Sequence, residues 1–182
     1  TGEDAEVKML LKPGAEVHSY EPTPQDMIAI QNCDVFLYIG GESDEWVRNV
    51  LESIDTSQMQ VVALMDCVDV AEEAENGFAW NGEHDHDEHE DIEYDEHIWT
   101  SPKNAIKIIE KIERVLCELD EEKQETYSKN AQEYISEIDD IDMQIRDIVK
   151  HAKRKTLVFG DRFPFKYFVE EYGLDYKAAF PG

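Results

Sequence analysis

The sequence lacks the motifs that mark several common classes of functional site. Its three cysteines, Cys33, Cys67 and Cys117, form no C-x-x-C pair, which excludes zinc-finger and thioredoxin-like sites. There is no H-E-x-x-H pair, no G-x-S-x-G nucleophile motif and no glycine-rich phosphate loop. Each cysteine lies in an apolar stretch, so we expect small buried thiols rather than ligands.

Positive charge and long apolar runs are also scarce. Seventeen Lys and Arg stand against 43 Asp and Glu, a formal net charge of −26. This charge excludes nucleic acid and anionic membrane surfaces as partners and is compatible with attracting cations. No apolar run is long enough to span a bilayer, and there is no signal peptide. Because the chain begins with Thr1 and not with Met, we expect that an N-terminal segment has been removed.

Apolar and aromatic residues are abundant enough for a folded core. They make up 41% of the chain, with eight Tyr, seven Phe and three Trp. Continuous apolar runs bounded by turn residues alternate with stretches of helical periodicity, which predicts βαβ units and a mostly parallel sheet flanked by helices. The expected strands cover residues 5–11, 34–40, 59–68, 156–159 and 175–180, and the expected helices 24–32, 46–54, 101–117, 120–150 and 166–172.

These elements divide the chain into three parts. We expect an N-terminal α/β lobe over residues 1–117, a long linking helix over 118–152, and the beginning of a truncated second α/β lobe over 153–182. Apolar residues in the long helix recur at steps of three and four, which predicts a packing face. They are Tyr127, Ala131, Tyr134, Ile138, Ile141, Ile145 and Ile148.

Histidines gather beside acidic residues in one stretch of the N-terminal part. The loop at 82–96 contains His84, His86 and His89, and its segment 84–90 has no apolar residue, so we expect a solvated metal-collecting loop. His97 instead precedes Ile98-Trp99 and a helix start, which favours one fixed geometry and a ligand role. Imidazole suits Zn²⁺ and related transition metals, and it must be neutral to bind, so affinity should fall below about pH 6.5.

A second candidate ligand, His18, is distant from His97 in sequence and also lies in a predicted loop. His18 follows a predicted strand end, where open α/β sheets bind ligands. We expect an acidic neighbour to orient each ring, and the nearest in sequence are Glu16, Glu21, Asp95 and Glu96.

Four segments resemble one known family. They are G-A-E-V-H-S-Y-E-P-T-P-Q-D at 14–26, D-E-H-I-W-T-S-P-K-N-A at 95–105, the long helix, and F-K-Y-F-V-E-E-Y-G-L at 165–174. Together they resemble the metal-specific substrate-binding proteins of zinc and manganese ABC transporters, in the same order and over nearly the whole chain. The resemblance implies two α/β lobes joined by a rigid helix, with the metal held between them and delivered to a membrane permease. It also implies that the protein acts outside the cytoplasm, either in the periplasm or attached to the membrane by a lipid anchor.

The resemblance also implies a ligand set. His18 falls on the family's first ligand and His97 on its second. The third is a His or Glu shortly before the aromatic helix, where this chain has Arg162, which cannot bind a cation. Asp161, one residue earlier, is the expected oxygen substitute, and the fourth ligand would lie beyond Gly182. Zn²⁺ is the favoured metal and Mn²⁺ the second.

Two other function classes remain open from the residues alone. The first is a metallohydrolase using His18, His97 and an acid around an open zinc position. The second is a helical interaction module built on the apolar stripe of the long helix, with the acidic loop as a solvated insertion. Turnover of an ester or peptide would favour the first, and metal-independent self-association would favour the second.

Overall fold

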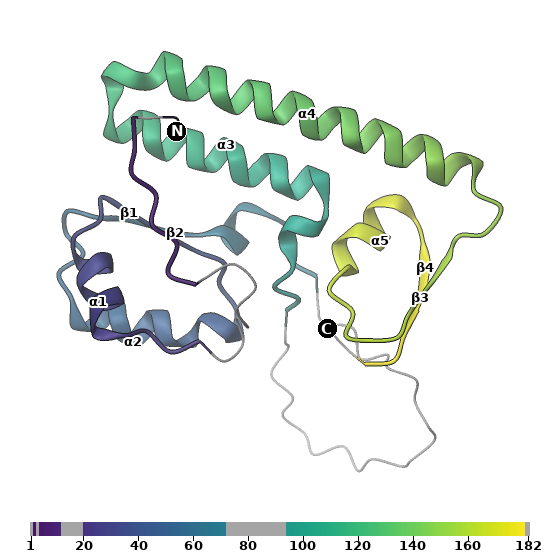
Figure 1. Cartoon of the computed structure of the whole chain (residues 1–182), viewed down its shortest axis with the longest axis horizontal. Helices are drawn as coiled ribbons and strands as arrows, with labels where there is room; N and C mark the ends of the chain where they lie inside the picture. Colours follow the sequence, from purple (N-terminus) through teal and green to yellow (C-terminus); the bar gives the residue numbers. More distant parts are fainter. Residues whose placement is uncertain (1, 3, 12–19, 72–93, 181–182) are drawn as a thin grey trace, which may run out of the picture.

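The computed structural model describes residues 2, 4–11, 20–71 and 94–180 of the chain. It has the expected α/β architecture, with short parallel strands and flanking helices (Figure 1). The helices are α1 (Pro24–Gln31), α2 (Glu45–Ser53), α3 (Pro102–Leu119), α4 (Gln124–His151) and α5 (Lys166–Tyr172). The strands are β1 (Val35–Tyr38), β2 (Gln60–Ala63), β3 (Thr156–Phe159) and β4 (Asp175–Ala178).

Two separate βαβ units form the strand-containing parts of the molecule. β1 and β2 pair in parallel with Val35 opposite Gln60, and α2 connects them. β3 and β4 pair in parallel with Thr156 opposite Asp175, and α5 connects them. Both units lie along the antiparallel pair α3–α4, the first beneath α3 and the second beneath the carboxyl-terminal half of α4 (Figure 1).

The helix ends follow the capping residues in the sequence. Thr23 caps α1 and exchanges hydrogen bonds with Asp26, while Pro24 occupies the first turn. Ser101 caps α3 by accepting a hydrogen bond from the N–H of Asn104. Gly173 ends α5 in the left-handed conformation, with φ of 59°. The boundaries read from these signals are therefore close to those observed.

Three expectations from the sequence are wrong in detail. Residues 5–11 form no strand in the described part of the chain, where they pair with no neighbouring strand. The expected strand at 59–68 ends at Ala63 and continues as the 3₁₀ turn Leu64–Cys67. The three cysteines are free but only half-buried.

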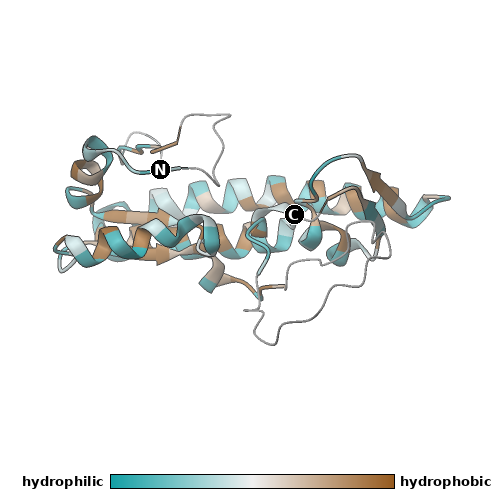
Figure 2. Cartoon of the chain, turned by 90° about the horizontal axis from the view of Figure 1, so that it is seen from below, coloured by the Kyte–Doolittle hydropathy of each residue, from teal (hydrophilic) through white to brown (hydrophobic). Residues whose placement is uncertain are grey.

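The apolar stripe of α4 is only partly a packing face. Tyr127 and Ala131 are buried, while Tyr134, Ile141 and Ile148 remain more than half exposed. Length accounts for the exposure of Ile148: α4 has 28 residues, about 42 Å at 1.5 Å per residue, and its antiparallel partner α3 has only 18, so the carboxyl-terminal end of α4 extends beyond α3 (Figure 1). Figure 2 shows how hydrophilic and hydrophobic residues alternate along the helices.

Among the described residues, three apolar clusters make up the core. One joins α1, β1 and α2 around Ile30 and Phe36, and another lies inside the second βαβ unit around Phe163 and Val169. The third crosses between the units, because Tyr167 of α5 packs with Ile98 and Ile108 of the first part. Ile98, the residue after His97, is completely buried there. This third cluster positions the candidate site.

Candidate metal site

The candidate site is built where β1 and β2 end. The backbone N–H of Met65, after β2, donates to the carbonyl of Ile39, after β1, at 2.9 Å, so the two outgoing loops are joined. Gly40 and Gly41 follow with φ of 95° and 91°, a conformation that requires glycine. Open α/β folds bind ligands at the carboxyl end of a parallel sheet, and these loops lie at that end of β1 and β2.

The segment Asp95-Glu96-His97 is fixed against this edge from both sides. Asp95 donates its backbone N–H to the carbonyl of Ala71 at 3.0 Å. Glu96 Oε1 accepts a hydrogen bond from the backbone N–H of Ser43 at 2.6 Å. The Glu96 side chain lies so close to Gly41 that a Cβ there would be 2.7 Å from its Cγ and Oε1. His97 therefore follows two residues that are anchored to different loops.

His97 is oriented by the carboxylate of Asp95. Asp95 Oδ1 accepts hydrogen bonds from the backbone N–H of His97 at 2.8 Å and from its ring Nδ1 at 2.9 Å. A carboxylate can only accept, so Nδ1 carries the proton in this contact and the lone pair falls on Nε2. Asp95 is 3% exposed, which strengthens the hydrogen bond by excluding water. This is the carboxylate–histidine arrangement that prepares an imidazole for a metal.

Acidic side chains surround the strand edge beside His97. Burial, with the nearby charge of Glu96 as a smaller cause, raises the pKa of Asp44. Asp44 Oδ2 also accepts the backbone N–H of Gly40 at 2.9 Å, which holds the glycine turn in place. Asp44, Asp95 and Glu96 thus make the potential at this strand edge negative, which attracts cations.

Of the other candidate ligands, the structure describes only Asp161. Asp161 lies in the loop after β3, is exposed, and accepts the backbone N–H of Arg162 at 2.9 Å. His18, His84, His86 and His89 lie outside the described residues. Within the described ranges, no three His, Cys, Asp or Glu side chains gather closely enough to hold a metal, so the ligand set beyond His97 stays a prediction.

Tyr20, two positions after His18 and within the described residues, packs against α2. Tyr20 packs edge-on against Trp46 in the first turn of α2, with ring centroids 5.2 Å apart. Burial, followed by the neighbouring Asp26, raises the pKa of Tyr20 to about 12. The first turn of α2 directly follows the loop that binds Glu96, so Tyr20 lies at the same end of the βαβ unit as His97.

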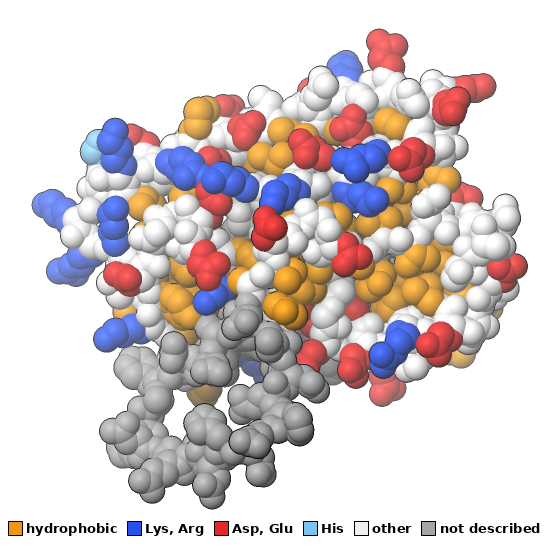
Figure 3. Space-filling view, turned by 180° about the vertical axis from the view of Figure 1, so that it is seen from behind, with side chains coloured by type: hydrophobic (Ala, Val, Ile, Leu, Met, Phe, Trp, Pro, Cys, Tyr) orange, Lys and Arg blue, Asp and Glu red, His pale blue; other side chains and the backbone are white. Residues whose placement is uncertain are grey.

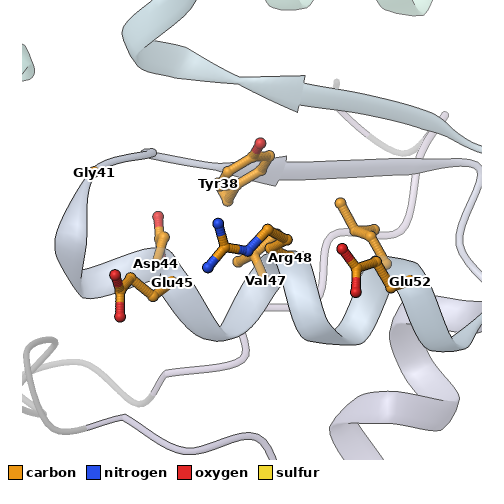
Figure 4. A pocket seen from close by; sticks show the side chains of 8 residues that line it. Tyr38, Gly41, Asp44, Glu45, Val47, Arg48 and Glu52 are labelled. Carbon is orange, nitrogen blue, oxygen red and sulfur yellow. The ribbon is translucent and has the colours of Figure 1, made fainter.

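A hollow of about 530 Å³ between β1 and α2 has a lining unsuited to a metal ion (Figure 4). Arg48 contributes a permanent positive charge, and none of the lining residues is His or Cys. The lining residues are Tyr38, Gly41, Asp44, Glu45, Val47, Arg48, Leu51 and Glu52.

Sequence reasoning named Asp95 as one of four acidic neighbours and missed the groups that hold it. The hydroxyl of Tyr167 donates to the Asp95 carbonyl at 2.7 Å, and the N–H of Ala71 donates to the same hydroxyl at 3.1 Å. Tyr167 is 72 positions from Asp95, and no spacing in the sequence connects them. The aromatic pattern of the segment at 165–174 was the only signal available.

Charges of both signs are mixed on one face of the molecule. On the face in Figure 3, Lys and Arg side chains are interspersed with Asp and Glu. Several form ion pairs, such as Lys103 with Glu171 at 2.6 Å and Lys107 with Asp69 at 3.1 Å. Among the described helices, none is both long and apolar enough to cross a membrane.

Comparison with known proteins identifies the family. The family described as "Zinc-uptake complex component A periplasmic" matches residues 1–182. The zinc-binding lipoprotein AdcA of Streptococcus pneumoniae is 33% identical over 177 residues, which are 95% of this chain and 34% of AdcA. The iron-binding protein YfeA of Yersinia pestis is 33% identical over 176 residues, 95% of this chain and 51% of YfeA.

Solved structures show the same relationship in three dimensions. Zn(II)-bound AdcA from Streptococcus pneumoniae superposes with a TM-score of 0.79 at 28% identity, covering 97% of this chain and 35% of that one. The metal-dependent lipoprotein YcdH of Bacillus subtilis gives 0.81 at 28% identity, covering 97% and 59%. The chain thus spans about a third to a half of the two curated relatives. It belongs to the family of the periplasmic zinc-uptake component A, whose members are metal-binding transport proteins and not enzymes.

Proposed function

We propose that this chain is part of an extracytoplasmic receptor that captures a divalent transition metal and delivers it to an ABC permease. Zn²⁺ is the favoured metal, because the relative AdcA is named as zinc-binding and its solved structure is Zn(II)-bound. Mn²⁺ is the second choice from the donor set, and the iron-binding name of YfeA shows that relatives differ in metal. The receptor would act in the periplasm or from a lipid anchor, as the names of the family and of AdcA suggest.

The single observation that carries this proposal is the state of His97. Its ring is held by a buried carboxylate through Nδ1 at 2.9 Å, and its side chain is 18% exposed. A histidine with only a packing role has no need of a buried, charged partner, whose desolvation is costly. A metal ligand does need one, because the partner fixes the tautomer and increases the basicity of Nε2.

The remaining parts of the site complete the proposal. His18 and Asp161 would join His97 in the cleft between the lobes, while His84, His86 and His89 would collect metal on the adjoining loop. In this arrangement residues 1–117 form the first lobe, 118–152 the link and 153–182 the start of the second lobe. The position of Tyr20 beside the first turn of α2 supports the placement of His18 at the His97 edge.

Calorimetric titration with Zn²⁺ tests the proposal. The unaltered chain should bind one Zn²⁺ tightly, and His97→Ala and His18→Ala should each weaken binding by at least tenfold. Deletion of residues 82–90 should leave tight binding intact, because the loop is proposed to collect metal and not to form the cleft site. Full affinity in His97→Ala, or loss of tight binding in the deletion alone, would refute the assignment.

His151→Ala is the matched control. His151 also contacts an acidic residue, with Nδ1 3.3 Å from Asp147 Oδ1, but its side chain is 67% exposed at the end of α4. This substitution removes an imidazole with a carboxylate neighbour from outside the proposed site. Its zinc affinity should equal that of the unaltered chain, and a comparable loss would show that the effect of His97→Ala is not specific.

A further inference from the structure

Three segments of the chain meet in a closed ring of hydrogen bonds beside His97. Asp95 donates its N–H to the carbonyl of Ala71 at 3.0 Å, and Ala71 donates its N–H to the Tyr167 hydroxyl oxygen at 3.1 Å. The Tyr167 hydroxyl donates in turn to the Asp95 carbonyl at 2.7 Å. Each of the three residues donates once and accepts once in the ring. Within the ring the Tyr167 hydroxyl both donates and accepts, so its two hydrogen bonds polarise and strengthen one another.

The ring joins parts of the molecule that are distant in sequence. Ala71 follows the 3₁₀ turn after β2, Asp95 precedes His97, and Tyr167 belongs to α5 of the second βαβ unit. Tyr167 is 5% exposed and packs against Ile98 and Ile108, so its hydroxyl is delivered to Asp95 by apolar burial. α5 lies directly beside the turn Ile98–Thr100 (Figure 1).

The position of Asp95 determines the position of the His97 ring. The carboxylate of Asp95 binds His97 twice, through the backbone N–H and through Nδ1. The backbone of Asp95 is held in turn by the ring, through its N–H and its carbonyl. A shift of this backbone would move the carboxylate away from Nδ1 and allow the other tautomer, whose Nε2 is protonated and cannot bind a metal.

We infer that Tyr167 is a positioning residue for His97: its hydroxyl fixes Asp95, and through Asp95 the imidazole, so that metal capture depends on docking of α5 against the first unit. The inference rests on the proposed role of His97 as a metal ligand. It adds that the second βαβ unit prepares a ligand carried by the first, in addition to any ligand of its own. Separation of α5 from the turn Ile98–Thr100 would break two of the three hydrogen bonds in the ring and loosen the metal ligand.

Tyr167→Phe is the direct test, with Tyr172→Phe as its matched control. Tyr172 belongs to the same helix, is 7% exposed, and donates its hydroxyl to Asp142 Oδ1 at 2.8 Å, away from Asp95. Both variants keep the aromatic ring; Tyr167→Phe loses the two hydrogen bonds of its hydroxyl in the ring, and Tyr172→Phe loses its hydrogen bond to Asp142. The Zn²⁺ dissociation constant should rise about 10- to 100-fold in Tyr167→Phe and less than twofold in Tyr172→Phe. Equal affinities for the two variants would overturn the inference.

A second measurement needs no metal and separates this inference from the proposed function. Nitrogen chemical shifts of the His97 ring in the metal-free protein report the tautomer. The proton should reside on Nδ1 in the unaltered chain and in Tyr172→Phe, and it should be shared between both nitrogens in Tyr167→Phe. An unchanged tautomer in Tyr167→Phe would overturn the positioning role. Failure of the unaltered chain to bind Zn²⁺ would instead overturn the proposed function, while the tautomer result would still decide the role of Tyr167.

Hydrogen exchange in the unaltered protein provides a test that does not depend on the variant's folding. The amide proton of Ala71 should exchange as slowly as those in the middle of α5, because its acceptor, the Tyr167 hydroxyl, leaves when α5 undocks. Fast exchange at the Ala71 amide beside a protected α5 would overturn the inference.

Discussion

Replacement of Asp95 by Asn is the perturbation that most directly examines the chemistry of the site. The amide oxygen of Asn can still accept the backbone N–H of His97, now 2.8 Å from Asp95 Oδ1. The hydrogen bond to Nδ1, now 2.9 Å long, would lose its charge. Rotation of the amide would also present an N–H₂ group to Nδ1, which stabilises the tautomer that cannot ligate through Nε2.

The magnitude follows from the difference between two kinds of hydrogen bond. A hydrogen bond to a charged group contributes about 1.5–3 kcal/mol and a neutral one about 0.5–1.5 kcal/mol. The difference of about 1–1.5 kcal/mol corresponds to roughly tenfold in a binding constant. Asp95 is 3% exposed, so solvent screening does not reduce this value substantially. Asp95→Ala, which removes the oxygen that accepts both hydrogen bonds, should weaken Zn²⁺ binding further, by about 100-fold.

Competition calorimetry against a chelator of known affinity measures the effect at pH 7.5. Asp69→Asn is the control, since Asp69 lies just after the 3₁₀ turn Leu64–Cys67 and has a fully exposed side chain paired with Lys107. It should bind Zn²⁺ as the unaltered chain does. Circular dichroism confirms that each variant is folded. Zinc affinity within twofold of the unaltered chain in a folded Asp95→Asn would refute the role assigned to this carboxylate.

Three further predictions concern the scaffold. Gly41→Ala should lower the free energy of unfolding in urea by about 1–3 kcal/mol, because φ is +91° and the new Cβ would lie 2.7 Å from Glu96; an unchanged midpoint would contradict this. Ile98→Ala should cost about 2–5 kcal/mol in the same assay, since the side chain is fully buried, and a loss under 1 kcal/mol would count against the interunit core. Hydrogen bonds from the hydroxyl and then the backbone N–H of Thr23 lower the pKa of Asp26 below its ordinary value of 3.8. The contribution of Asp26 to stability should be complete above pH 3.8 and disappear as the pH falls through the lower folded-state pKa. The free energy of unfolding of Asp26→Asn should therefore fall less steeply with pH in this range. The same pH dependence in both proteins would exclude the contribution.

Much of the local structure could be predicted because it depends on neighbours in sequence. Thr23-Pro24, Ser101-Pro102 and Gly173 mark helix ends through capping and backbone conformation, which involve only a few adjacent residues. The apolar runs that became β1 and β3 were recognisable for the same reason. Strand length was less predictable, because β2 ends where its partner β1 ends.

The α4 stripe shows where such reasoning fails. Periodicity indicated one continuous apolar face, and it is present, but it does not specify how much of that face a partner covers. α3 is shorter than α4, so Tyr127 is buried and Ile148 is exposed although both belong to the same stripe. Burial depends on the length and direction of a second helix.

The sequence by itself determined the alternation of strands and helices, the family to which the chain is similar, and His97 as a candidate ligand beside an acidic neighbour. These features rest on local propensity and on short motifs. Only the tertiary structure decided that Asp95, among four acidic neighbours, holds the ring, and that Tyr167 of α5 holds Asp95. The physical reason is that a hydrogen bond between distant segments depends on where packing brings their backbones, and no spacing along the chain records that position.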